Sequence, residues 1–262
     1  MVKSWNEWGE GNYLEPDLKY GKGFIKALRA DHNELRRKIE SSSNRNIKGY
    51  ICVVDGPSLA RSYKNASFLN LLQQSYANTC DGGSVAFMAN RLTKRNLKAF
   101  TGPEIFAEYV VNPTYKQVLL GNTDKKYKMI SEKVAKEVGN TDYLYHVPLP
   151  FASIDEFDYE GIARKIDSID ADIIWVSLGA PKQEFFMQRL LPHLNRGVML
   201  GVGAAFSYYL DELKDYKFRL GEIRLNWILR LFTEPKKQFR RVGSMMLCYP
   251  LIYNNERKRR RS

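Results

Sequence analysis

The chain has 262 residues, of which 44% are hydrophobic and 27% charged, and its formal net charge is +12. A chain of this length and apolar content builds one large domain, alone or with appendages, and is not a disordered protein. Its three cysteines and three histidines share no short spacing, which argues against a zinc site and a disulfide framework and fits a reducing cytoplasm.

The N-terminal segment, residues 1–45, is expected to stand apart from the rest of the chain. Its stretch SWNEWGEGNYLEPDLKYGKGFIKALR resembles the end of a WbsX-like barrel, a group similar to family ninety-nine glycoside hydrolases. A β/α barrel closes only with all of its strands, so this piece cannot form a barrel site alone. We expect an inactive arm with a helix over residues 23–39 and then a polar linker from Ser41 to Asn44.

Strands and helices alternate over residues 46–213, which predicts an α/β fold with a Rossmann-like, doubly wound parallel sheet. Apolar runs rich in branched residues predict buried strands, and apolar residues three or four apart predict helices. The expected strands cover residues 47–54, 117–120, 143–147, 172–178 and 198–201, and another ends just before Asp81. The expected helices cover residues 59–73, 104–109, 125–138 and 161–169, and one more begins at Pro181.

Asp81 stands where one of these strands ends, and two glycines follow it. A carboxylate at such a position, with glycines that let a substrate come close, suits a general base for a substrate hydroxyl. The alternative is that Asp81 caps a helix that begins near Ser84, since Asp is a favoured capping residue. From this position alone, the cap is the favoured interpretation.

The strand, helix, strand unit of residues 171–206 carries the clearest candidate ligand site. Lys-Gln-Glu occupies a first helical turn, whose free N–H groups and positive dipole end attract anions. Two glycines after the next strand leave room for a ligand, so a diphosphate fits at these strand ends. An ordinary turn with solvated side chains explains the spacing equally well, and the lack of a third glycine argues against a nicotinamide cofactor. The residues concerned are Gly179, Lys182, Gln183, Glu184, Gly201 and Gly203.

An Asp-x-Asp pair at Asp170 and Asp172 is a pattern with which many nucleotide-sugar transferases hold a divalent cation. The pair stands at the start of an expected strand, whereas the candidate ligand site stands at strand ends. We therefore expect the pair at the opposite edge of the sheet, and we predict no metal cofactor.

The C-terminal segment, residues 214–262, is strongly basic. It has fourteen Lys or Arg against four Asp or Glu, so ten of the twelve net positive charges lie there. Helical spacing predicts a helix over residues 222–232 and another from Pro235, while the apolar residues 245–253 are too few to span a bilayer, which takes ~20. Basic residues interleaved with apolar ones are typical of a helix on an anionic membrane surface. The same charge would suit nucleic acid phosphates, and a basic segment by itself does not discriminate between the two.

The stretches GAPKQE and GVGAAF, followed by LNWILRLFTEPKKQFRR, resemble motifs of the bacterial WecG/TagA/CpsF glycosyltransferase family, over about residues 47–242. The resemblance implies an inverting, metal-independent transferase that moves a sugar from a UDP-sugar to a saccharide on a polyprenyl diphosphate. Such a protein takes part in the synthesis of a surface polysaccharide, such as a capsule or O-antigen, as a peripheral protein at the cytoplasmic face of the plasma membrane. It favours the membrane over nucleic acid as the partner of the basic segment and leaves a homo-oligomer open.

The resemblance also implies roles for single residues. It makes Asp81 the expected general base and Gln183 a second catalytic residue. The implied donor and diphosphate ligands are Gly179, Lys182, Glu184, Gly201, Gly203, Arg224, Arg230 and Arg240, and the implied acceptor ligands are Asp55, Thr101 and Gly102.

The chain departs from the family at several of its motif positions. It has Val53 and Asp55 where the family has Thr and Asn, Ala99 where the family has Arg, and Ser207 where the family has Asp. The nearby Asp211 or Glu212 would have to supply the carboxylate missing at residue 207. These departures keep a second hypothesis open, a degenerate, non-catalytic relative that docks on a membrane or on partner enzymes. A nucleic-acid-binding protein is a weaker third.

Overall fold

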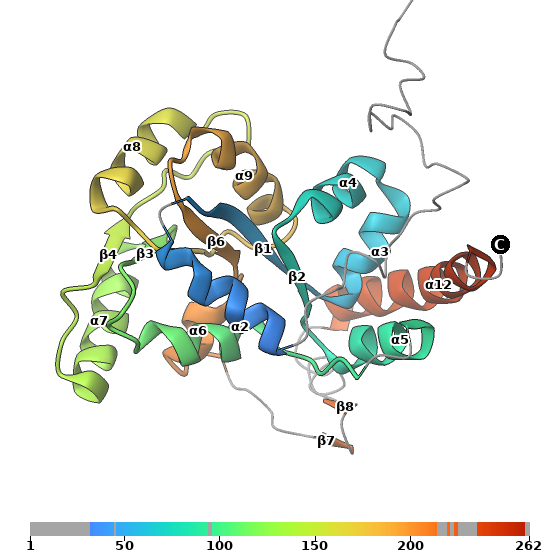
Figure 1. Ribbon diagram of the computed structural model, residues 1–262. Coiled ribbons are helices and arrows are strands. Elements are labelled where there is room, and N and C mark those ends of the chain that lie inside the picture. The colour runs from blue at the N-terminus through green and yellow to red at the C-terminus, as the bar shows by residue number, and fades with distance from the viewer. Residues whose placement is uncertain are drawn as a thin grey trace, which may run out of the picture.

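The protein is described by a computed structural model over residues 32–44, 46–93, 96–213, 219–220, 223–224 and 235–259. At its centre is a sheet of six parallel strands in the order β2-β1-β6-β5-β3-β4, which confirms the expected α/β, Rossmann-like fold (Figure 1). The strands are β1 (Lys48–Val54), β2 (Ala77–Cys80), β3 (Gln117–Leu120), β4 (Leu144–Val147), β5 (Ile173–Val176) and β6 (Gly197–Gly201). They lie close to the predicted runs, because strands covered on both faces are apolar throughout.

Helices cover both faces of the sheet. One face carries α3 (Gly56–Lys64), α4 (Ala66–Gln74), α5 (Gly83–Thr93), α8 (Tyr159–Ile169), α9 (Lys182–Leu190) and α12 (Pro235–Arg259). The other face carries α2 (His32–Glu40), α6 (Gly102–Val110), α7 (Asp124–Val138) and α10 (Ala205–Tyr209). Short 3-10 helices, η2 (Ser41–Ser43) and η3 (Leu191–His193), follow α2 and α9. In Figure 1, α8 and α9 lie above the strands and α6 and α7 below them, so the sheet is the middle of three layers.

The register of the sheet brings the ends of its central strands together. β1 pairs with β2 so that Val54 lies beside Cys80, and it pairs with β6 so that Cys52 lies beside Gly201. β5 continues this row, with Val176 beside Gly201. Because all the strands are parallel, the segments that follow β1, β2, β5 and β6 meet at one edge of the sheet, which we call the carboxyl edge.

The segment predicted as one helix over residues 59–73 forms two helices instead. Asn65 separates α3 from α4, and its Oδ1 accepts a hydrogen bond from the N–H of Phe68 at 3.0 Å, which caps α4. The apolar periodicity continues through the break, because both helices pack on the same core.

α2 lies upstream of the expected domain boundary at residue 45, yet it packs on the sheet. Its side chains Leu35 and Ile39 are completely buried in the core beside α6 and α7. An exposed ion pair between Arg36 and Glu108 of α6, at 2.7 Å, adds a polar contact to the same packing. The helix therefore forms part of the α/β unit. The predicted linker that follows it, Ser41 to Asn44, contains η2 and buries Ser42. Residues 1–31 of the predicted N-terminal arm lie outside the described residues.

The basic segment differs from its prediction at one point. Residues 222–232 were expected to be helical, but Ile223–Arg224 forms β8, which pairs antiparallel with β7 (Arg219–Leu220). The remaining residues of that predicted helix lie outside the described part of the chain.

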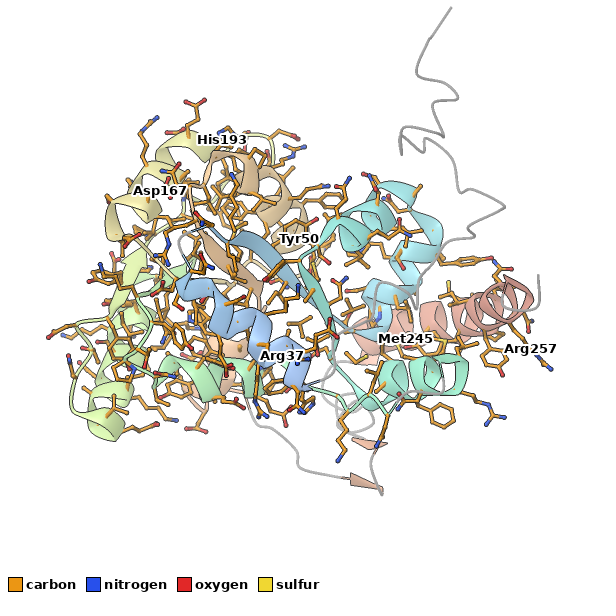
Figure 2. All side chains as sticks on the ribbon, viewed as in Figure 1. Arg37, Tyr50, Asp167, His193, Met245 and Arg257 are labelled. Atoms are coloured by element: carbon orange, nitrogen blue, oxygen red, sulfur yellow. The ribbon has the colours of Figure 1, made fainter. Side chains whose placement is uncertain are left out.

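α12 begins at Pro235, as predicted, because proline is tolerated in a first helical turn. It packs on α3 and α5, and it buries Cys248 and Ile252 in the core of the α/β unit. Figure 2 shows Met245 next to α3 and α5, and Arg257 near the far end of the helix. Among the described helices, including the 25 residues of α12, none combines the length and the hydropathy of a bilayer-spanning segment.

Candidate active site

Gln183 lies at the carboxyl edge and is held at both ends of its side-chain amide. Its Oε1 accepts a hydrogen bond from the N–H of Gly203 at 3.0 Å, and its Nε2 donates to Oε1 of Glu184 at 3.0 Å. A side chain on Gly201 would crowd this arrangement, because its Cβ would lie 3.1 Å from the Gln183 Nε2. The predicted neighbourhood of Gln183, Gly201 and Gly203 is therefore present.

α9 presents its first turn to this edge, although it begins one residue later than predicted. Lys182 is its first residue, and Pro181, expected at the first helical position, is the N-cap residue. The N–H of Gln183 donates to the carbonyl of Gly179 at 3.0 Å, which joins the turn to the helix. Other N–H groups of such a first turn point along the helix axis toward the site.

Two polar residues that were not predicted as site residues complete the backbone scaffold. Ser177, which follows β5, donates from its Oγ to the carbonyl of Gly203 at 2.6 Å. Asn122, which follows β3, donates from Nδ2 to that Oγ at 2.8 Å. The available signal was their position, since Ser177 stands near the end of one predicted strand and Asn122 just after another, and polar residues at strand ends gather at the carboxyl edge.

Asp81 lies after β2 and contacts the segment that leads into α6. Its Oδ1 accepts a hydrogen bond from the N–H of Gly102 at 3.1 Å. Gly102 in turn lies against Val202, the residue that follows β6, because a Cβ there would be 2.9 Å from the carbonyl oxygen of Val202. Asp81 is partly exposed, so the structure brings an accessible carboxylate to the same edge as Gln183. Its role as a base stays a prediction.

The two other predicted acceptor ligands are helix caps in this structure. Thr101 caps α6 in a reciprocal box with Glu104, whose Oε2 accepts from the Thr101 N–H at 3.0 Å. Asp55 caps α3, and its Oδ1 accepts from the N–H of Ser58 at 2.8 Å. Each cap places its residue at the carboxyl edge.

The side chains of Lys182 and Glu184 are both held by contacts within the protein. The Lys182 Nζ donates to the carbonyl of Ala152 and lies 5.1 Å from the centre of the Phe157 ring. Glu184 is only 1% exposed, and its burial raises the pKa of its carboxyl group to about 7. Neither side chain projects freely into the site.

A second polar group surrounds Ser207, where the resembled family has Asp. The Nζ of Lys126 donates to the Ser207 Oγ at 2.8 Å and forms an ion pair with Glu212 at 2.8 Å. The hydrogen bond from Lys126 lowers the pKa of Glu212. Of the two candidate carboxylates, Glu212 therefore reaches residue 207, whereas Asp211 pairs with Lys133.

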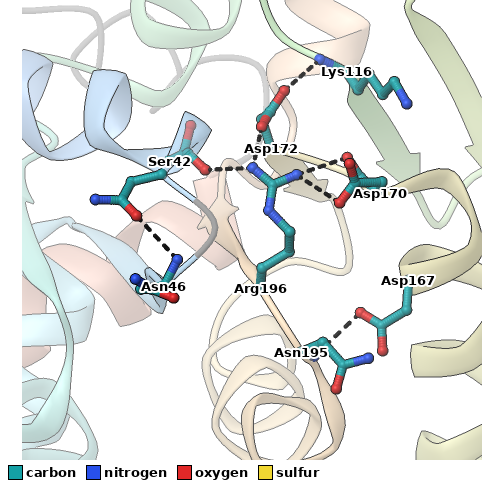
Figure 3. A network of polar contacts seen from close by, with 9 residues as sticks. Ser42, Asn46, Lys116, Asp167, Asp170, Asp172, Asn195 and Arg196 are labelled. Atoms are coloured by element: carbon teal, nitrogen blue, oxygen red, sulfur yellow. Dashed lines mark hydrogen bonds and ion pairs between the residues drawn. The ribbon is translucent and has the colours of Figure 1, made fainter.

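The Asp-x-Asp pair lies at the opposite edge of the sheet, as predicted, and holds an arginine (Figure 3). Nη2 of the buried Arg196 pairs with Asp172, and its Nη1 lies 3.0 Å from an Asp170 oxygen. Asp172 also accepts from the N–H of Lys116 at 2.8 Å. The guanidinium of Arg196 lies between these two carboxylates, so the Asp-x-Asp pair binds an arginine of the protein and has a structural role. Over the described ranges, no cluster of three or more His, Cys, Asp or Glu side chains suits a metal ion.

The predicted arginine ligands cannot be placed in the site. Arg224 lies in β8 and Arg240 in α12, but their side chains lie outside the described part of the structure, as does all of Arg230. Their contact with a diphosphate stays a prediction.

Comparison with known proteins identifies the family to which the chain belongs. A sequence model described as "Glycosyl transferase WecG/TagA/CpsF family" matches residues 25–262. The chain belongs to this glycosyltransferase family. The match extends beyond the expected residues 47–242 at both ends and includes α2 and α12. A second model, described as "Glycosyltransferase WbsX", matches residues 1–28, which include part of the stretch that resembles the end of a WbsX-like barrel.

Two relatives of this WecG/TagA/CpsF family member carry the same name, N-acetylglucosaminyldiphosphoundecaprenol N-acetyl-beta-D-mannosaminyltransferase. The protein from Staphylococcus aureus is 21% identical over 223 residues, which cover 84% of each chain. The protein from Bacillus spizizenii is 23% identical over 219 residues, which cover 80% of this chain and 81% of the relative. The similarity to these relatives therefore extends over most of each chain.

Proposed function

We propose that the protein is an inverting glycosyltransferase that transfers a sugar from a UDP-sugar to a polyprenyl-diphosphate-linked saccharide in cell-surface polysaccharide synthesis. The proposal rests on two hydrogen bonds at the carboxyl edge, from the Gly102 N–H to Asp81 and from the Gly203 N–H to Gln183. They bring a carboxylate and an amide to one edge of the sheet in a member of this glycosyltransferase family. The relatives' name describes a lipid diphosphate acceptor, which supports the acceptor class.

In the proposed reaction, Asp81 accepts the proton of the acceptor hydroxyl while that oxygen attacks the anomeric carbon of the donor. The bond from the anomeric carbon to the diphosphate oxygen breaks on the opposite face, so the configuration inverts and UDP leaves with the bonding electrons. Gln183 Nε2 and the first turn of α9 stabilise the charge that develops on the diphosphate. Arginines of the basic segment add cationic contacts.

The first donor to test is UDP-N-acetylmannosamine, because both relatives are named as N-acetylmannosaminyltransferases. Around the sugar we place Lys126, Ser207 and Glu212. Together they offer a cation, a hydroxyl and a carboxylate near the end of β6.

The deciding experiment measures UDP release by the purified protein from UDP-N-acetylmannosamine, UDP-N-acetylglucosamine and UDP-glucose. Each donor is tested with and without a synthetic polyprenyl-diphosphate-linked N-acetylglucosamine. Release that requires the acceptor supports the proposal and identifies the donor. No release, together with no change in melting temperature on addition of UDP, overturns it, and DNA binding that weakens with salt would then favour the nucleic acid alternative.

A lipid-linked acceptor requires the site to stand near a membrane, and α12 offers a suitable surface. Its apolar side chains Met246 and Leu247 are 73% and 70% exposed, and Leu251 beside them is also exposed. Phe87 of α5, the helix next to α12, is exposed as well. We therefore propose that α12 rests on the anionic inner face of the plasma membrane through these side chains and its basic residues.

Replacing Met246 and Leu247 with Ser is expected to weaken binding to phosphatidylglycerol vesicles by more than about tenfold, since each buried apolar side chain is worth about 1.5–3 kcal/mol. Vesicle sedimentation measures the effect. The matched control is Met129→Ser on α7, an exposed methionine away from α12, which should bind like the wild type. Equal binding by the double variant and the control would contradict the membrane surface.

A further inference from the structure

Glu184 combines a buried carboxyl group with a direct contact to a predicted catalytic side chain. Its Oε1 accepts the hydrogen bond from Gln183 Nε2 at 3.0 Å. Its Oε2 is buried and has no hydrogen-bond partner in the described part of the protein. The carboxyl group thus lies directly behind the amide that faces the carboxyl edge, and only one of its oxygens is satisfied.

The charges around Glu184 do not compensate an ionised carboxylate. Asp55, just after β1, repels a negative charge at Glu184. Arg61 of α3 attracts that charge, but in the described part of the protein its Nη1 is buried without a hydrogen-bond partner. Cys52 of β1 faces the same group, and burial raises its pKa well above the ordinary value. An unpaired carboxylate in such surroundings is costly, because burial penalises the charged form more than the neutral form.

We propose that Glu184 serves the diphosphate site as a neutral carboxyl group, which holds the Gln183 amide in place and takes up a proton from solvent when the donor binds. The carbonyl oxygen of a neutral carboxyl group still accepts from Gln183 Nε2. Its neutrality removes a negative charge that would repel a diphosphate at the first turn of α9. The proposal rests on the proposed function for the identity of the ligand.

Proton uptake follows from thermodynamic linkage. Burial sets the pKa of Glu184 at about 7, so the unliganded protein at neutral pH contains both forms. A diphosphate nearby favours the neutral form, and the neutral form must in turn favour the diphosphate by the same factor. UDP affinity should therefore fall by about tenfold from pH 6 to pH 8, as the site ionises.

The test is calorimetric titration with UDP at pH 6, 7 and 8, in two buffers of different ionisation enthalpy. Glu184→Gln keeps an acceptor for Gln183 but cannot ionise, so it should bind UDP without the pH-dependent loss and without proton uptake at this residue. Glu184→Met removes the acceptor and should bind more weakly than Glu184→Gln at every pH. Glu160→Gln, an exposed glutamate of α8, is the matched control and should follow the wild type. The ionisation of UDP itself is common to all four proteins.

A pH dependence of Glu184→Gln equal to that of the wild type would overturn the proposal. If the wild type does not bind UDP, the proposed function fails instead. A carbon NMR titration of the unliganded protein then decides the state of Glu184. A midpoint near 7, followed by the side-chain amide resonance of Gln183 and absent in Glu184→Gln, supports a neutral carboxyl group that positions the amide. A midpoint near the ordinary value of 4.5 overturns it.

Discussion

Replacing Asp81 with Asn is expected to slow sugar transfer by about 10²-fold or more, the lower end of what a lost general base costs. The amide keeps an oxygen that can accept from the Gly102 N–H, so the segment before α6 keeps its place. What the variant loses is a group able to take the acceptor proton. Initial rates of UDP release, with donor and acceptor saturating, measure the effect.

Asp142→Asn provides the matched control for this variant. Asp142 is an exposed aspartate outside the carboxyl edge, and its substitution should leave the rate unchanged. UDP binding by Asp81→Asn should match the wild type, because the loss concerns a proton transfer and not the diphosphate. A rate within about threefold of the wild type would assign Asp81 to helix capping and the base to another residue.

Replacing Arg196 with Met is expected to lower the free energy of unfolding by about 3–5 kcal/mol, the usual cost of breaking a buried ion pair. The substitution leaves the carboxylates of Asp170 and Asp172 without their cation. It also removes the hydrogen bond from Nη2 to the carbonyl of Ser42 at 3.0 Å, which joins the segment after α2 to the sheet. Urea denaturation followed by circular dichroism measures the loss.

The control is Arg189→Met, the same substitution at an exposed ion pair. The side chain of Arg189 is 44% exposed and pairs with Asp155, whereas that of Arg196 is 10% exposed. Exposed pairs contribute about 0–1 kcal/mol, so this variant should denature almost like the wild type. Similar losses in both variants would show that the Arg196 network adds no more than a surface pair.

The sheet could be predicted from the sequence because its strands are buried on both faces. The run Gln117–Leu120 is apolar apart from Gln117, and β3 has those bounds. The single polar residue is satisfied inside the core, where its Oε1 accepts from the Trp175 indole at 2.7 Å. The helix break at Asn65 could not be predicted from apolar periodicity. The spacing of apolar residues continues from α3 into α4, whereas the break results from the Asn65 side chain, which caps α4.

The sequence predicts which residues of the site lie at strand ends, but not how their side chains are oriented. Asp81, Gln183 and Gly203 follow strands, so a parallel sheet brings them to one edge. The orientation of their side chains depends on residues distant in sequence. The amide of Gln183 is held by a backbone group twenty residues later, and Lys126 reaches Ser207 across eighty-one residues. The burial of Glu184 likewise results from packing between elements distant in sequence. From the sequence alone, Glu184 is expected to be a solvated residue of a first helical turn.

The packing of α12 has a practical consequence for producing this protein in quantity. Because Cys248 and Ile252 fill the core beside α3 and α5, removing the helix to improve solubility would uncover an apolar face of the catalytic unit. Such a face promotes aggregation. Polar substitutions confined to Met246, Leu247 and Leu251 leave that interface intact, and they offer the safer route to a homogeneous preparation for crystallisation.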